Sequence, residues 1–125
     1  MEIERRRFTR YNAEGEGYEV FSRESGIHGR LKDISKGGLA YQYQPVNGVP
    51  ASEVVDILVR DSEKISLQKL TCRTIYDVVE LAADRTFRGT EIRLRGLEYI
   101  NLSDDQERDL ENLLKSLRNG NLTNH

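Results

Sequence analysis

The chain has few of the residues that cross-link a small fold. Its 125 residues include one cysteine, Cys72, which excludes an internal disulfide framework and a cysteine-rich zinc site. Only two histidines are present, His28 and His125, so a histidine-based metal site is not expected. A chain of this length fits one domain and buries enough apolar surface to fold without cross-links.

Long apolar runs are missing as well. No stretch approaches the roughly 20 residues that cross a bilayer. Met1 to Arg10 is charged, whereas an export signal needs an apolar segment. We therefore expect no membrane insertion and a reducing, cytoplasmic location, which suits a protein with a single cysteine.

An excess of one charge is also absent, because 19 basic and 21 acidic side chains give a net charge of −2. Long nucleic acids select a broadly basic surface, so we expect no nucleic-acid partner. The basic residues are unevenly placed, and a cluster of arginines lies between Arg5 and Arg10. Such a short cluster on a near-neutral domain suits a small, discrete anion.

Short segments of extended character follow one another from residue 13 to residue 100. They are separated by polar or glycine-containing turns, and several are rich in β-branched or aromatic residues. This spacing predicts an all-β barrel or sandwich, and closure into a barrel would remove exposed strand edges. The expected strands cover 18–22, 29–35, 39–44, 54–59, 65–76 and 91–100.

The end of the chain has a helical pattern instead. Ser103 and Gln106 fit a capping box, and Asn119-Gly120 is a stop signal, so we expect a helix over 104–118. Such a helix either packs on the barrel as a lid or docks a partner. Its apolar positions follow an i, i+3, i+4, i+7 spacing and are Leu110, Leu113, Leu114 and Leu117.

The arginine-rich segment is the first cluster with chemical potential. Each guanidinium offers a planar fork of donors that fits phosphate oxygens and the O6 and N7 acceptors of guanine. Arg6 and Arg10 are four residues apart, so a helical turn or tight loop would place them on one side. The alternative interpretation is a solvated basic tail.

Residues 33–38 form the second cluster, where an expected strand enters a turn. Asp33 can accept two donors at once, which matches the N1–H and N2–H edge of guanine, or it can bond its own backbone in an Asx turn. Ser35 can donate to a phosphate. Gly37 and Gly38 tolerate positive φ and would leave amides free for an anion. Together, the two clusters supply complementary halves of a guanine-nucleotide site.

In this order and spacing, Arg6-x-x-x-Arg10 and Asp33-x-Ser35-x-x-Gly38 resemble the signature of the PilZ domain family. The resemblance implies a six-stranded antiparallel β-barrel with a C-terminal α-helix. It also implies a bacterial receptor for the second messenger cyclic di-GMP. Two further segments are similar to strands of the family, 70–76 and 96–103.

The resemblance implies a role for each motif residue. Arg6 and Arg10 would grip guanine bases and phosphates, and Asp33 would bond a guanine edge. Ser35 would contact phosphate, and Gly38 would permit the turn. The ligand would be the only bound small molecule, with no cofactor and no metal.

Arg5 precedes the first motif arginine and offers an additional guanidinium, which we expect to favour a stacked ligand dimer. The basic arm at 1–12 is expected to be mobile without ligand and to become ordered on binding. The barrel would span 13–103, the helix 104–118 and a flexible tail 119–125. The ordered arm or the helix would signal to an unidentified protein partner, and the chain would be a monomer or weak homodimer.

Three other interpretations remain open. An enzyme would need Ser35, His28 and a carboxylate in one site, or a reactive Cys72. His28 suits a surface position and Cys72 a buried inert thiol, so no enzymatic activity is expected. A barrel that binds single-stranded nucleic acid would use the six tyrosines for stacking, although packing explains most of them. The third interpretation is a PilZ-type protein adaptor with weak or no nucleotide binding.

Overall fold

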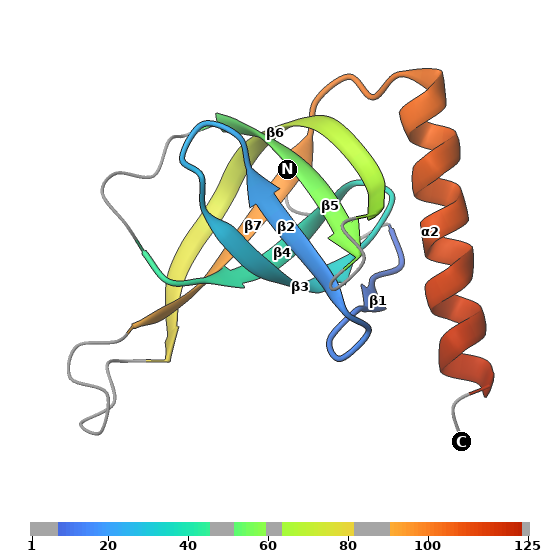
Figure 1. The fold of residues 1–125 in the computed structure, drawn as a ribbon, viewed down its shortest axis with the longest axis horizontal. Coiled ribbons are helices and arrows are strands. Elements are labelled where there is room, and N and C mark those ends of the chain that lie inside the picture. Colours follow the sequence, from blue (N-terminus) through green and yellow to red (C-terminus); the bar gives the residue numbers. More distant parts are fainter. Residues whose placement is uncertain (1–7, 46–51, 60–63, 82–90, 124–125) are drawn as a thin grey trace.

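The computed structural model describes residues 8–45, 52–59, 64–81 and 91–123 (Figure 1). Apart from one helix, the regular structure in these ranges is β-strand. The elements are β1 (Tyr11–Asn12), β2 (Tyr18–Ser22), β3 (His28–Ile34), β4 (Gly38–Tyr43), β5 (Ser52–Val59), β6 (Lys64–Leu81), β7 (Ile92–Tyr99) and α2 (Asp104–Thr123).

Six of these strands close into an antiparallel barrel, which confirms the predicted fold class. Neighbouring strands run in the order β3-β2-β5-β6-β7-β4, and β3 pairs with β4 to complete the ring. The short β1 adds to β3, with Tyr11 opposite Ile34. Closure gives each of the six barrel strands a neighbour on both sides, so in the described ranges only the two-residue β1 is an edge strand.

The barrel interior combines an apolar core with a buried ionic group. Arg95 is 1% exposed, and its Nε lies 2.7 Å from Oε2 of Glu53. Its Nη1 lies 3.0 Å from Oδ2 of Asp77. Burial alone would raise the pKa of Asp77, but hydrogen bonds from Tyr43, Arg93 and Arg95 outweigh it, so the pKa is lowered. The ionic group therefore links β4, β5, β6 and β7 across the core.

Helix α2 packs along the barrel beside β1 and β6 (Figure 1). The capping box is formed as predicted, because the Gln106 N–H donates to Ser103 Oγ at 3.1 Å and the Ser103 N–H donates to Gln106 Oε1 at 2.9 Å. The apolar face of the helix covers the barrel, which agrees with the lid interpretation. Its buried residues are Leu110, Leu113, Leu114 and Leu117.

The helix ends later than the sequence predicts. It continues through Asn119-Gly120 to Thr123, past the predicted end at residue 118, while 124–125 lie outside the described residues. A glycine inside a helix costs only about 1 kcal/mol, and no proline follows to end this helix. Within the described part of the chain, α2 included, no helix has the length and apolar character of a membrane span.

Candidate functional site

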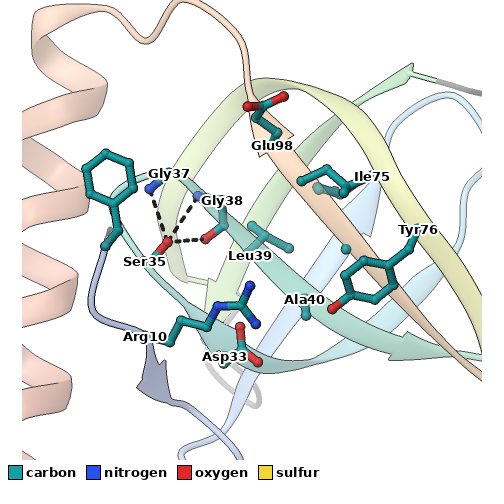
Figure 2. A pocket seen from close by; sticks show the side chains of 13 residues that line it. Arg10, Asp33, Ser35, Gly37, Gly38, Leu39, Ala40, Ile75, Tyr76 and Glu98 are labelled. Atoms are coloured by element: carbon teal, nitrogen blue, oxygen red, sulfur yellow. Dashed lines mark hydrogen bonds between the residues drawn. The ribbon is translucent and has the colours of Figure 1, made fainter. Parts of the chain in front are cut away.

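A cavity of about 330 Å³ lies against the outside of the barrel, between the segment before β1 and strands β3, β4, β6 and β7 (Figure 2). Most of the predicted site residues contribute to its wall. Arg5 and Arg6 lie outside the described residues. The predicted residues that the structure brings together here are Arg10, Asp33, Ser35, Gly37 and Gly38.

Residues that pair across neighbouring strands form the floor of the cavity. Asp33 pairs with Ala40, and Ala40 pairs with Gly96. Two residues away on the same strands, and hence on the same face, Gly38 pairs with Glu98. The small residues in the middle leave the floor flat, and Figure 2 shows Asp33 and Glu98 on opposite sides of it.

A β-bulge explains why Asp33 faces this cavity rather than the core. Leu31 and Ile34 are both fully buried, although they are three residues apart and would face opposite ways in a regular strand. The register of β3 against β4 shifts between Leu31 and Asp33, so Lys32 is the extra residue. A bulge changes the direction of the side chains that follow it. As a result, Asp33 lies on the outer face, while Ile34 fills the core.

Asp33 is a half-buried acid without a hydrogen bond to its carboxylate from any described residue, so it does not form the alternative Asx turn. Burial raises the pKa of this carboxyl, and the charges of Arg10 and Lys32 only partly offset the rise. Figure 2 shows the exposed Arg10 guanidinium beside the carboxylate. The site therefore holds a desolvated acceptor next to a cationic donor.

Ser35 organises the turn that follows Asp33. The Gly37 and Gly38 amides donate to Ser35 Oγ at 3.1 and 3.3 Å (Figure 2). The expectation that both amides are free for an anion is therefore wrong. The Ser35 hydroxyl itself points to the Gly38 carbonyl at a long 3.4 Å, so its proton can turn toward a better acceptor in the cavity. Tyr99 also holds the turn, because its hydroxyl donates to the Ser35 carbonyl at 3.1 Å.

Neither Gly37 nor Gly38 adopts a positive φ, so what matters at these positions is the space around the missing Cβ. A Cβ on Gly38 would lie 2.0 Å from the carbonyl oxygen of Leu97. A Cβ on Gly37 would lie 2.8 Å from the ring of Phe8. The turn thus lies directly against β7 on one side and against the segment before Arg10 on the other.

Several cavity residues were not predicted from the sequence. Glu98 on β7 forms an ion pair with the exposed Arg73 of the neighbouring β6. Ala40 and Gly96, small residues inside strands, indicate a close approach to the backbone but do not identify a ligand. The remaining unpredicted wall residues are Phe8, Leu39, Ile75, Tyr76 and Leu97.

The residues of the enzyme interpretation have other environments. His28 is exposed at the start of β3, with Nδ1 3.8 Å from Oε1 of Glu19. Cys72 is fully buried, and burial raises the pKa of its thiol to about 12, so it is protonated at neutral pH and unreactive. In the ranges that the structure describes, no three His, Cys, Asp or Glu side chains group as metal ligands do.

Solved structures similar to this chain come from cyclic di-GMP systems. The PilZ domain of YcgR from Escherichia coli, solved with c-di-GMP, has a TM-score of 0.70 at 18% identity, and the match covers 92% of each chain. MrkH, described as a c-di-GMP-dependent transcription regulatory factor, has a TM-score of 0.60 at 17% identity. That match covers 89% of this chain and 50% of MrkH, so the chain spans about half the length of that protein.

At these identities the structural likeness establishes the fold. No curated protein matches the chain significantly. The sequence profile of the PilZ domain matches residues 4–116, which include both motifs and most of the helix. The chain therefore belongs to the PilZ domain family.

Proposed function

We propose that this chain is a bacterial receptor for cyclic di-GMP. The observation that supports this most directly is Asp33, a half-buried carboxylate that accepts no hydrogen bond from the described residues and faces a cavity beside Arg10. Leaving a desolvated acceptor unsatisfied is costly, so a ligand that supplies donors would gain from the pairing. The family, and the ligand of the similar YcgR domain, agree with this choice of ligand.

Each side chain has a distinct part in the proposed complex. The two oxygens of Asp33 accept the N1–H and N2–H donors of one guanine. The Arg10 guanidinium donates to a phosphate, or to the O6 and N7 atoms of guanine. Ser35, held by the amides of Gly37 and Gly38, turns its hydroxyl proton to a phosphate oxygen.

Arg6 and Arg5 extend this grip from the N-terminal arm. Arg6 would bind guanine and phosphate together with Arg10, as the family motif implies. The additional guanidinium of Arg5 would favour a stacked pair of ligands, which presents twice the phosphates and guanines. Binding would order the arm over the cavity, and this newly packed surface would signal to a protein partner. Part of the interaction free energy would be used in ordering the arm.

Replacement of Arg10 by alanine tests the proposed binding site. We expect Arg10→Ala to weaken cyclic di-GMP binding by at least about tenfold, because a charge-assisted hydrogen bond contributes roughly 1.5–3 kcal/mol. Titration calorimetry measures the affinity. Arg118→Ala, which removes an exposed arginine of α2, is the matched control and should bind as the wild type does. Equal affinities for Arg10→Ala and the wild type would contradict the assignment.

The stoichiometry tests the part proposed for Arg5. The wild-type chain should bind two cyclic di-GMP molecules, and Arg5→Ala should shift the ratio toward one. A ratio of one for the wild type would remove the dimer hypothesis and leave the rest of the site in place.

If a folded chain binds no nucleotide, the alternative is an adaptor of the PilZ type. The search for partners would then turn to the N-terminal arm and the exposed face of α2.

A further inference from the structure

A second β-bulge turns Tyr76 toward the cavity. The register of β6 against β7 shifts between Thr74, which pairs with Leu97, and Tyr76, which pairs with Gly96. Ile75 is therefore the extra residue. In a regular ladder Ile75 would pair with Gly96, and Tyr76 would take the next position, opposite the inward-facing Arg95. The bulge instead places Tyr76 on the outer face, as the bulge in β3 does for Asp33.

The bulges turn Asp33 and Tyr76 to the outer face, and these two residues lie at the two ends of one row of paired residues across four strands. The row runs Asp33, Ala40, Gly96, Tyr76 over β3, β4, β7 and β6. With strands about 4.8 Å apart, it extends for roughly 14 Å. Asp33 and Tyr76 are the large side chains of the row, and both line the cavity. The two small residues between them, Ala40 and Gly96, are buried beneath the cavity.

The Tyr76 ring lies over Gly96. A Cβ on Gly96 would be 2.3, 2.5 and 2.8 Å from three ring carbons, so only glycine permits this ring position. Figure 2 shows the ring beside Ala40, with its hydroxyl directed toward the side of the cavity that holds Asp33 and Arg10. Tyr76 is half-buried, so part of its side chain stays accessible from the cavity.

We infer that Tyr76 is a base-contacting residue of this site, whose ring packs against a purine of the bound nucleotide. The inference rests on the proposed function, since it assigns a further residue to the same cavity. Asp33 reads the edge of a base, which distinguishes guanine from adenine. The Tyr76 ring contacts the aromatic face of a base, and every purine has such a face. Asp33 would therefore select guanine, whereas Tyr76 would add affinity for any purine.

This division predicts different consequences for the two residues. Tyr76→Ala should weaken cyclic di-GMP binding by about tenfold, within the range found when stacking aromatics are replaced by alanine. Tyr76→Phe keeps the ring and should bind close to the wild type. The preference for cyclic di-GMP over cyclic di-AMP should survive in Tyr76→Ala and decrease in Asp33→Ala. A purely structural role for Tyr76 would not separate affinity from selectivity in this way.

The experiment is titration calorimetry of the full chain and these variants with cyclic di-GMP and cyclic di-AMP. Val78→Ala is the matched control, because Val78 is two residues along β6, is 48% exposed and is not part of the cavity wall. Thermal unfolding of each variant establishes that it is folded. Should Tyr76→Ala fail to fold, the comparison of Tyr76→Phe with Tyr76→Leu, which fills a similar space without a ring, takes its place.

The outcomes separate this inference from the proposed function. The inference is supported if Tyr76→Ala or Tyr76→Leu binds cyclic di-GMP more weakly than Tyr76→Phe does and keeps the preference over cyclic di-AMP. Wild-type affinity in these variants, or an equal loss in Tyr76→Phe, overturns the assignment to the ring while cyclic di-GMP binding stands. If the folded wild type binds neither nucleotide, the proposed function fails and the inference fails with it.

Discussion

At the scale of one residue, Asp33 is unfavourable for folding but well placed for binding. Its carboxylate is partly removed from water, and no described residue donates a hydrogen bond in return. The raised pKa means that folding disfavours the ionised form, so this group opposes folding at neutral pH. Residues that a fold tolerates at a cost are common at functional sites.

Asp33→Asn is expected to abolish guanine selectivity without a loss of stability. The amide is neutral, so its burial costs less than that of the carboxylate. It also presents a donor to the N1–H and N2–H edge in place of one acceptor. We expect a melting temperature at or above that of the wild type at pH 7, with cyclic di-GMP affinity at least about tenfold lower. A clear drop in melting temperature would contradict this account of Asp33.

The pH dependence follows from the same carboxyl. Its folded-state pKa lies above the ordinary value of 3.8, so it gains a proton earlier than an exposed aspartate as the pH falls. Protonation removes its opposition to folding, and the stability difference between the wild type and Asp33→Asn should narrow toward acid pH. Cyclic di-GMP affinity should decrease over the same range, because a protonated carboxyl no longer accepts both donors. Melting curves and titrations between neutral pH and pH 4 measure both trends.

At the scale of the element, β-bulges decide which side chains reach the cavity. The sequence predicts the strands well, because alternation and turn residues are local properties, and β2 occupies the expected 18–22. Alternation alone gives the wrong face for Asp33 and Tyr76, since each follows an extra residue. A bulge depends on the partner strand, which a local pattern does not contain. The motif therefore identified Asp33, whereas Tyr76, outside the motif, was missed.

The turn between β3 and β4 provides a test at the same scale. In Gly38→Ala the new Cβ would lie 2.0 Å from the Leu97 carbonyl, and backbone atoms of a paired strand cannot move away easily. We expect a loss of about 2 kcal/mol in the free energy of unfolding, as for overpacked sites, together with weaker ligand binding. Denaturant titration measures the loss.

Gly37→Ala is the matched control for this prediction. Its Cβ would meet only the Phe8 ring, which is 40% exposed and free to shift. This variant should therefore unfold close to the wild type. Equal stability of the two alanine variants would show that the contact of Gly38 with β7 is not important for the fold.

At the scale of the whole molecule, an ionic group inside the barrel lies directly behind the cavity floor. Arg95, which precedes the floor residue Gly96, points into the core and joins Glu53 and Asp77. The sequence predicted the closed barrel and the packed helix, but not this ionic group. Its members are distant in sequence, and their charges suggested solvent-exposed positions.

Arg95→Met is expected to destabilise the barrel strongly. The substitution keeps much of the side-chain volume but leaves Glu53 buried without its cation, a change that typically costs about 3–5 kcal/mol. Asp77 loses one of its two arginine partners and keeps Arg93. Arg73→Met is the control, because its ion pair with Glu98 is at the surface and should contribute less than about 1 kcal/mol. Urea denaturation compares the two variants. A loss below 1 kcal/mol in Arg95→Met would show that the ionic group does not stabilise the barrel.

Titration calorimetry of the wild-type chain with cyclic di-GMP, beside GTP and cyclic di-AMP, is the first experiment to make on the proposed receptor. We predict that the chain binds cyclic di-GMP with a clear preference over cyclic di-AMP, because the two oxygens of Asp33 match the adjacent N1–H and N2–H donors of guanine, which adenine lacks, while the arginines hold the phosphates. A folded sample that binds none of the three, or that binds cyclic di-AMP equally well, would contradict it.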